Sequence, residues 1–304
     1  MKVFLTGGTG FVGQEILRRL QDAGHSARIL VRSQSPIVQE LVARYGCEVR
    51  PGDVTDERSL KGAVEGVDAV IHLVGVISEV GRSTFENIHT RGTQNVLAAA
   101  HEASVRRFVH MSALGTRANA VSRYHKSKWA AEEAVRQSGL EYTIFRPSLI
   151  YGPRDHFVNL FAKITSLSPV VPILGRRSAR FQPVAVEAIA TAFVKSITEP
   201  KSIGQTYDLC GNETFTLAEI VDQILAVTGR KRLKLHVPSA VADFQAITLE
   251  FLFGRVLRRP PPLNRDQLIM LNEDNIGDPR PAGLLFGLPQ VSFRDGIAAY
   301  LKRK

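Results

Sequence analysis

Residues 6–13 read Thr6-Gly7-Gly8-Thr9-Gly10-Phe11-Val12-Gly13, and this stretch decides the fold. It follows a short apolar run and precedes a segment whose apolar residues recur at helical spacing. Glycines three positions apart permit a tight turn and a close approach of backbone to a pyrophosphate, whose charge would face the free amides of the helix start. The alternative is a purely structural turn. We expect a dinucleotide to contact Gly7, Thr9, Gly10, Phe11, Val12 and Gly13.

Working outward, the first half of the chain alternates β-branched runs with helical patterns. Such alternation predicts an α/β protein with a Rossmann-type, doubly wound parallel sheet. The expected strands are Val3–Thr6, Ala27–Val31, Glu48–Arg50, Ala69–Leu73, Arg107–Met111 and Tyr142–Phe145.

The pattern loosens after Pro153, where glycine and proline become denser. Two helical stretches stand out there, near Leu217–Val227 and Val241–Leu257. We therefore expect residues 1–153 to form the dinucleotide-binding domain. Residues 154–304 should form a smaller α/β lobe over the cleft, interwoven with the first and carrying the substrate or lid elements.

Composition narrows the setting of the protein. Two cysteines, Cys47 and Cys210, cannot form a disulfide framework, which favours a reducing, cytoplasmic compartment. The sequence shows no signal-peptide pattern, no apolar run of membrane-spanning length and no metal-ligand spacing. The net charge of +10 lacks the aromatic-interleaved basic stripe of nucleic-acid binding, so a nucleic-acid partner is not expected. The oligomeric state is left open.

The end of the second expected strand bears on which dinucleotide binds. An NAD site usually places an acidic residue there to accept a hydrogen bond from the ribose 2′-hydroxyl. Here Arg32 and Ser33 follow the strand, and no acidic residue occurs before Glu40. A guanidinium and a hydroxyl suit a 2′-phosphate, so NADP(H) is favoured over NAD(H). The alternative is a surface arginine without a ligand.

Together these motifs resemble the short-chain dehydrogenase/reductase superfamily, in its extended and atypical branches, over almost the whole chain. Gly52-Asp53-Val54-Thr55-Asp56 looks like the family's adenine-side loop, and Ile71-His72-Leu73-Val74-Gly75 like the strand end that lines the cofactor. The resemblance also covers Asn87 with Gly92-Thr93-Gln94-Asn95, and Arg146-Pro147-Ser148-Leu149-Ile150-Tyr151-Gly152-Pro153. It implies cofactor contacts from Asp53, Val54, Leu73, Val74, Gly75, Asn87, Pro147 and Ser148.

Tyr124-His125-Lys126-Ser127-Lys128 matches the family's Tyr-x-x-x-Lys, which implies that Tyr124 and Lys128 are catalytic and contact the cofactor. Residues i and i+4 share one face of a helix. An ammonium about 6 Å from the phenol would lower its pKa by about two units, into range for acid–base catalysis. The family's third catalytic group is a Ser or Thr. Ser112 is the candidate for this catalytic role, although it falls one residue short of the family's position, which Ala113 occupies.

The segments Ser112-Ala113-Leu114-Gly115, 260–268 and 272–275 resemble a subgroup, the bacterial relatives of the NAD(P)H-binding accessory subunit of mitochondrial respiratory complex I. Two functions therefore stay open. One is an NADP(H)-dependent oxidoreductase or epimerase acting on an alcohol or carbonyl of unknown identity. The other is a non-catalytic, cofactor-binding assembly or redox-sensing subunit linked to complex I or quinone biosynthesis, peripheral to the inner membrane.

Two further segments have alternative interpretations. Arg176 and Arg180 lie where extended members of the superfamily close a loop over an anionic substrate; a solvated loop is the alternative. The stretch from Ala240 to Leu257 is too charged to span a bilayer. With Phe244, Ile247 and Phe251, followed by Arg255, Arg258 and Arg259, it predicts either an amphipathic helix on a membrane surface or a lid helix of the second lobe.

Overall fold

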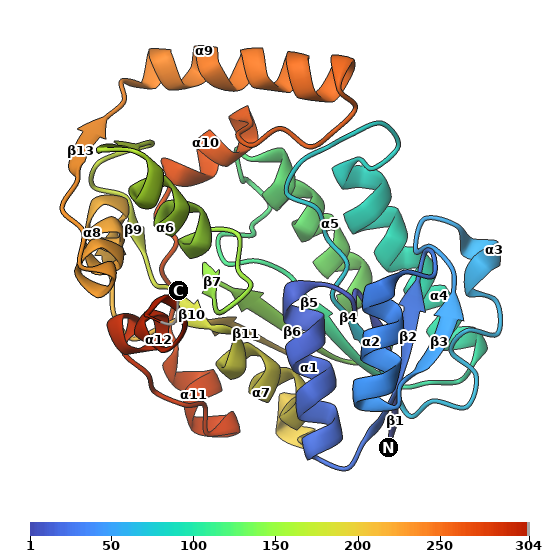
Figure 1. The fold of residues 1–304 in the computed structure, drawn as a ribbon. Coiled ribbons are helices and arrows are strands. Elements are labelled where there is room, and N and C mark those ends of the chain that lie inside the picture. Colours follow the sequence, from blue (N-terminus) through green and yellow to red (C-terminus); the bar gives the residue numbers. More distant parts are fainter. Residues whose placement is uncertain (303–304) are drawn as a thin grey trace.

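A parallel sheet forms the centre of the molecule in the computed structural model, which describes residues 1–302 but not the side chain of Arg255 (Figure 1). The sheet has seven strands in the order β11-β6-β5-β4-β1-β2-β3, and every pairing is parallel. Its strands are β1 (Lys2–Thr6), β2 (Ser26–Val31), β3 (Glu48–Pro51), β4 (Ala69–His72), β5 (Arg107–Met111), β6 (Glu141–Pro147) and β11 (Gln205–Leu209).

The strands expected from the sequence are confirmed, and so is the doubly wound α/β class. The strand order reverses between β1 and β4, because the chain first builds β1-β2-β3 outward and then returns to place β4 on the other side of β1. In such sheets the carboxyl ends of the two strands at the reversal leave a crevice, in which ligands bind.

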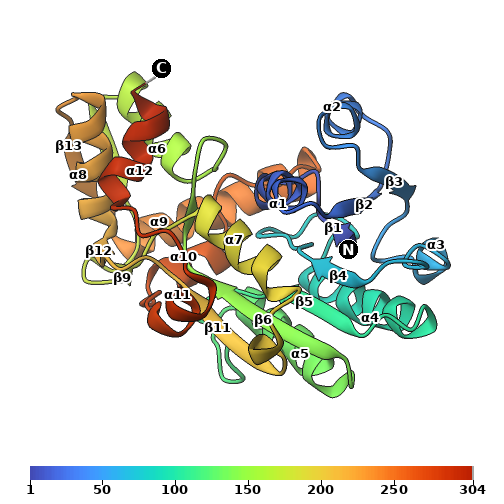
Figure 2. The ribbon, with the colours of Figure 1, turned by 90° about the horizontal axis from the view of Figure 1, so that it is seen from below.

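Helices cover both faces of the sheet, as Figure 2 shows from below. Successive residues of a strand point to opposite faces. On β1, Val3 and Leu5 pack in one core cluster and Phe4 in another. The first face is covered by α1 (Phe11–Asp22), α2 (Pro36–Tyr45), α7 (Val186–Ser196) and α11 (Arg280–Phe286). The opposite face is covered by α3 (Glu57–Leu60), α4 (Gly92–Glu102) and α5 (Arg123–Gln137), with the π-helix η1 (Glu86–Arg91) leading into α4.

The second lobe has its own apolar core. It is built from α6 (Val158–Leu167), α8 (Leu217–Thr228), α12 (Phe293–Leu301) and three two-stranded pairs: β7 (Ile150–Tyr151) with β10 (Val184–Ala185), β8 (Val170–Ile173) with β13 (Leu233–His236), and β9 (Arg180–Phe181) with β12 (Phe215–Thr216). Thr216 and Glu219 form a capping box at the start of α8, and Gly229 ends that helix with φ of 66°. A short 3₁₀ turn, η2 (Pro200–Ser202), precedes β11.

The chain returns to the first lobe after residue 153. Strand β11 pairs with β6 at the sheet edge, and α7 packs beside α1. A cut at residue 153 would therefore divide the central sheet. The division of the chain into domains stays a proposal.

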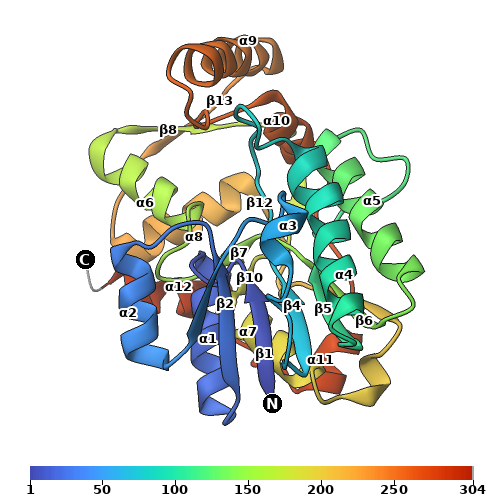
Figure 3. The ribbon, with the colours of Figure 1, turned by 90° about the vertical axis from the view of Figure 1, so that its right-hand side faces the viewer.

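A helical bar stands apart from the rest of the molecule, at the top of Figures 1 and 3. It consists of α9 (Ser239–Leu249), which continues directly into the π-helix η3 (Glu250–Val256); α10 (Arg265–Leu271) lies beneath it. The two helical stretches expected after residue 153 are thus present. Within residues 1–302, no helix is long and apolar enough to cross a bilayer.

Candidate functional site

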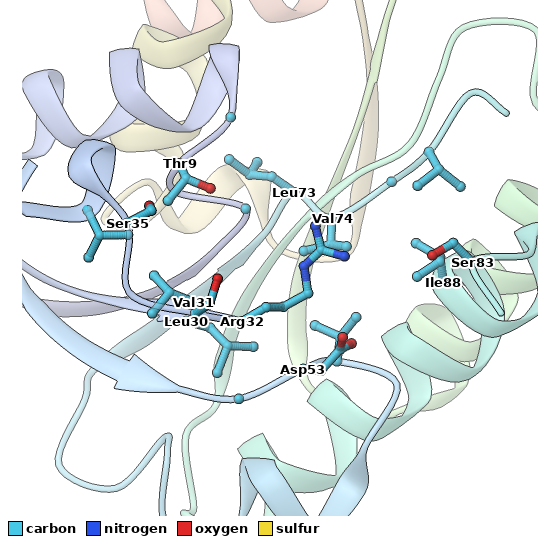
Figure 4. Close-up of a pocket in the computed structure, with 18 of the residues that line it drawn as sticks. Thr9, Leu30, Val31, Arg32, Ser35, Asp53, Leu73, Val74, Ser83 and Ile88 are labelled. Atoms are coloured by element: carbon cyan, nitrogen blue, oxygen red, sulfur yellow. The ribbon is translucent and has the colours of Figure 1, made fainter. Parts of the chain in front are cut away.

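A cavity of about 460 Å³ opens at the strand reversal, and the glycine turn forms one of its walls (Figure 4). Gly7 has φ of +77°, and Gly10 donates its amide to the Gly7 carbonyl at 3.0 Å. A Cβ on Gly13 would lie 2.2 Å from the Gly7 oxygen, so only glycine lets α1 approach the turn this closely. No side chain caps α1. Its first amides are therefore available to an anion.

Most of the residues expected to bind a cofactor gather at this cavity. Its lining includes Gly7, Thr9, Gly10, Arg32, Ser33, Asp53, Val54, Leu73, Val74 and Gly75. Phe11, Val12 and Gly13 lie in the first turn of α1, behind the glycine turn. Asn87 is in η1, where its side-chain amide donates to the Arg82 carbonyl at 3.0 Å. Pro147 ends β6, and the Ser148 hydroxyl donates to Asn275 Oδ1 at 2.5 Å.

Arg32 is exposed at the end of β2, and its side chain extends along the cavity toward Val74 (Figure 4). Asp53 lies just below the Arg32 side chain in this view, with Oδ1 accepting from the Thr55 amide at 2.9 Å. This arrangement leaves a guanidinium, rather than a carboxylate, at the strand end where the adenosine ribose of a dinucleotide would lie.

Lys128 reaches the inner end of the cavity from α5. Its Nζ donates to the Met111 carbonyl at 3.0 Å, and a Cβ on Gly75 would lie 3.1 Å from it. Gly75 therefore opens the space that the ammonium occupies. Burial lowers the pKa of Lys128 to about 8, with the Glu132 carboxylate opposing that shift.

Tyr124 lies one helical turn before Lys128, in an aromatic surround. Its ring meets the rings of Phe85, His89 and His125 with centroids 5.9, 5.3 and 5.3 Å apart. Burial, and then the Asp266 carboxylate, raise the pKa of Tyr124 to about 12. The expected lowering of this pKa by Lys128 is therefore wrong, because desolvation of the phenolate dominates and shifts the pKa in the opposite direction.

Asp266, which no sequence motif marks as part of the site, holds the start of α5. Its carboxylate accepts from the Ser122 hydroxyl at 2.8 Å and from the amides of Arg123 and Tyr124 at 2.8 and 2.9 Å. Ser122 itself caps the helix by accepting from the His125 amide at 3.2 Å. Since Asp266 comes from α10, far away in the sequence, no local pattern could reveal this contact.

A second cavity, of about 440 Å³, lies between the start of α5 and the η3–α10 segment. Its lining includes Phe85, Val121, Arg123, Asp266 and Ile269. Phe85 and Asp266 both contact Tyr124, so the tyrosine lies beside this second cavity. The Tyr124–Lys128 turn of α5 thus lies next to lining residues of both cavities, Gly75 of the first and Phe85 and Asp266 of the second.

Ser112 follows β5 directly and is turned toward α5. The side chain is 2% exposed, and its hydroxyl donates to Glu132 Oε1 at 2.5 Å. Glu132 also pairs with Arg136 and Arg146, at 2.6 Å in each case. The hydroxyl thus stabilises a buried carboxylate, and a catalytic role for Ser112 stays a prediction.

The two arginines expected at a substrate loop differ in their surroundings. Arg176 forms an ion pair with Asp274 at 2.6 Å and donates to the Asn272 carbonyl at 3.0 Å, so it ties the loop to the segment that follows α10. Arg180 is exposed on β9, and only its backbone amide contacts Asp274, at 3.1 Å. Substrate contact by either arginine stays a prediction.

Three buried histidines lie behind Lys128. His72 accepts from the Thr6 hydroxyl at 2.7 Å, contacts the Thr93 hydroxyl at 3.1 Å and stacks on His110 with centroids 5.5 Å apart. His89 accepts from the Val76 amide at 2.9 Å. Burial lowers the pKa of His72 to about 3 and that of His89 to about 2, and it lowers the pKa of His110 as well. These histidines are neutral at physiological pH. Across residues 1–302, no three His, Cys, Asp or Glu side chains gather as a metal site would require.

Comparison with known proteins agrees with this geometry. Residues 7–163 match the NAD(P)H-binding family model, and residues 115–249 match the RmlD substrate binding domain. A ceramide reductase of Caulobacter vibrioides is 31% identical over 78% of this chain and 73% of its own. The mitochondrial NADH dehydrogenase [ubiquinone] 1 alpha subcomplex subunit 9 of Arabidopsis thaliana is 29% identical over 89% of this chain and 69% of its own.

The fold recurs in solved structures. A UDP-glucose 4-epimerase of Thermotoga maritima superposes with a TM-score of 0.77 at 19% identity, covering 100% of this chain and 99% of the epimerase. At that identity the likeness concerns the fold alone. With the family match extending over the glycine turn, the cavity behind it and α5, this chain belongs to the NAD(P)H-binding family.

Proposed function

We propose that this chain is an NADP(H)-dependent oxidoreductase that acts on a carbonyl or alcohol group of a hydrophobic substrate. The observation that carries the proposal is the position of the Tyr124–Lys128 turn. Lys128 contacts Gly75 in the wall of the dinucleotide cavity, and Tyr124 contacts Phe85 and Asp266 in the wall of the second cavity. A cofactor in the first cavity and a substrate in the second would meet at this turn.

The residues present fit the cofactor. The uncapped start of α1 offers amides to a pyrophosphate, and Arg32 offers a guanidinium to a 2′-phosphate. Lys128 would bind the nicotinamide ribose. When bound, the reduced nicotinamide supplies hydride to a carbonyl carbon.

Tyr124 would hold the proton in this reaction. A phenol with a pKa of about 12 stays protonated across the physiological range, so in carbonyl reduction it can donate a proton to the substrate oxygen. Ala113 offers no hydroxyl beside it, and the Ser112 hydroxyl is bound to Glu132. Loss of one donor to a developing oxyanion typically costs about 10²- to 10³-fold in rate, so we expect slow turnover.

The hydrophobic substrate class is inferred from the relatives. The ceramide reductase of Caulobacter vibrioides is named for a lipid. The second cavity is lined by the apolar side chains of Phe85, Val121 and Ile269 and by polar residues such as Arg123 and Asp266. An apolar chain with a polar carbonyl head fits that mixture.

The test is NADPH oxidation with a panel of substrates: a long-chain 3-oxoacyl ester, a long-chain aliphatic ketone and a short-tailed ubiquinone. The wild type should oxidise NADPH only when one of these is present. Tyr124→Phe should reduce that rate at least 100-fold with unchanged NADPH affinity, since the phenol hydroxyl is removed and the ring stays. Tyr142→Phe, in β6, is the matched control.

The absence of a hydroxyl at Ala113 also favours a second function, that of a cofactor-binding subunit without catalytic activity. The Arabidopsis relative is named as a subunit of a respiratory dehydrogenase, and a subunit of that kind can hold a dinucleotide without turning it over. If NADPH binds tightly and no member of the panel accelerates its oxidation by the wild type, the enzyme proposal fails and this one takes its place.

A further inference from the structure

The helical bar α9–η3 has its small residues inside and its large apolar residues outside. Ala242 and Ala246 are buried and pack toward Leu268 of α10. On the outer side, Phe244 is 71% exposed, Phe251 62% and Val256 60%. This is the reverse of an ordinary surface helix, which buries its large apolar side chains and presents polar ones to water.

The outer residues form one continuous strip. Its members are all exposed, and most are three or four positions apart. They are Val241, Phe244, Ile247, Phe251, Leu252, Val256 and Leu257. Helical residues three and four apart share a face. An exposed apolar strip of this kind marks a surface that binds something else.

The charges around the strip indicate what that is. Arg258 and Arg259 follow the bar and are exposed, and so is Lys231 beside β13. Of the acidic residues on the bar, Glu250 is paired with Arg265 at 2.9 Å, and Asp243 lies between the strip and the buried alanines. The whole chain carries a net charge of +10. An apolar face with a basic flank matches the acyl and headgroup layers of an anionic bilayer.

The position of the bar suits a flat partner. In two perpendicular views it lies at one extreme of the molecule, on the side remote from α11 (Figures 1 and 3). The whole strip can therefore meet a plane without another element intervening.

We propose that the outer face of α9–η3 docks this protein on the surface of an anionic membrane, with Phe244 and Phe251 entering the headgroup–acyl boundary and Arg258 and Arg259 binding lipid phosphates. The docking does not depend on the proposed reaction. It would place the second cavity, which Glu250 and Gly254 of the bar help to line, close to the lipid surface.

Flotation of the full chain with vesicles of phosphatidylcholine alone, or with 30 mol% phosphatidylglycerol, tests the proposal. We expect binding to the anionic vesicles and at least tenfold weaker binding to neutral ones. The double variant Phe244→Ser/Phe251→Ser should weaken binding to anionic vesicles at least tenfold. Arg258→Gln/Arg259→Gln should weaken it about tenfold or more, since each basic residue near an anionic surface contributes about 1 kcal/mol.

Control substitutions of exposed leucines elsewhere on the surface distinguish docking through the bar from nonspecific hydrophobic binding to vesicles. Leu167 and Leu284 are 76% and 86% exposed on α6 and α11. Leu167→Ser/Leu284→Ser should bind vesicles as the wild type does. Unchanged NADPH affinity and an unchanged far-UV spectrum would show that the Phe244/Phe251 variant is folded.

Three outcomes overturn the proposal. The wild type fails to float with anionic vesicles; it floats, but both double variants of the bar float equally well; or light scattering shows a wild-type dimer that the Phe244/Phe251 variant converts to a monomer, with no vesicle binding. The last outcome would assign the strip to a second copy of the chain. NADPH oxidation is measured separately, so failure here leaves the proposed reaction standing.

Discussion

At the scale of single residues, the surroundings of a side chain determine its protonation and hydrogen bonding more than its place in a sequence motif does. The sequence names Tyr124, Lys128 and Ser112 by their positions in a motif, but the structure sets their chemistry. Desolvation raises the pKa of Tyr124 to about 12 and lowers that of Lys128 to about 8. The Ser112 hydroxyl donates a hydrogen bond to the Glu132 carboxylate of α5. In our proposal the phenol therefore acts as a proton donor, rather than as the easily ionised base that the neighbouring Lys128 suggested.

Arg32 decides the nucleotide preference in our proposal. Arg32→Ala should weaken NADPH binding about 10- to 100-fold, because a charge-assisted bond to the 2′-phosphate contributes about 1.5–3 kcal/mol. NADH, which lacks that phosphate, should change by no more than about twofold. Calorimetric titration with both nucleotides measures this, and Arg91→Ala, an exposed arginine on η1, is the control. Equal weakening of both nucleotides would remove the 2′-phosphate argument.

The buried histidines should make the protein sensitive to acid. Their folded pKa values are lowered, whereas in the unfolded chain they titrate near 6.5. Below pH 6.5 the unfolded state takes up protons and the folded state does not. The free energy of unfolding therefore decreases as the pH is lowered, until the pH reaches the folded pKa values. Each such histidine contributes a slope of about 1.4 kcal/mol per pH unit.

His110 offers the cleanest test of this linkage, because neither of its ring nitrogens has a hydrogen-bond partner within the described chain. His110→Leu should raise the free energy of unfolding at pH 7.5 and flatten its fall between pH 6 and 5 by about 1.4 kcal/mol per unit. Urea unfolding at several pH values measures both, with His101→Leu on the exposed end of α4 as control. A variant with the slope of the wild type would mean that His110 is protonated in the folded state.

At the scale of elements, the ends of helices make the site. The start of α1 is left uncapped where an anion would bind, and the start of α5 is capped twice, by Ser122 within the sequence and by Asp266 from α10. The second cap holds Tyr124 in place and also raises its pKa. One carboxylate thus links α10 to the helix that carries Tyr124 and Lys128.

Asp266→Asn tests both effects of this carboxylate, the stabilisation of the start of α5 and the raised pKa of Tyr124, by two separate measurements. An amide cannot accept from all three donors, so we expect a loss of about 1–2 kcal/mol in the free energy of unfolding. Because the negative charge is gone, the pKa of Tyr124 should fall. Alkaline titration of tyrosine absorbance, read as a difference from Tyr124→Phe, gives that pKa. An unchanged or higher value would contradict the assigned role of Asp266.

At the scale of the whole molecule, the two lobes share one sheet. Strand β11 completes the edge beyond β6, and the rings of Phe193 in α7 and Phe145 in β6 lie 4.7 Å apart. Phe145, Ile189 and Phe193 belong to the same buried cluster as Val3 and Leu5 of β1. The cofactor lobe therefore depends on residues beyond 153.

A fragment of residues 1–153 tests this dependence. Without α7 one face of the sheet is uncovered, and without β11 the edge of β6 is open, so the fragment should aggregate or lack cooperative unfolding. A fragment of residues 1–210, which restores both elements, should be more soluble and should regain more near-UV circular dichroism. A cooperatively unfolding, NADPH-binding fragment of 1–153 would show instead that the first lobe is a contiguous domain.

The sequence by itself determined the strands β1 to β6, the doubly wound class and the glycine turn, since buried parallel strands are continuous apolar runs and a turn against a helix start has few solutions. It did not reveal β11, because Gln205–Leu209 is a half-buried edge strand with a mixed pattern. Nor could it find Asp266 beneath Tyr124, the partner of Ser112, or the outward face of α9. Those depend on which distant segments meet, and burial, which sets pKa values and exposed faces, exists only once they have met.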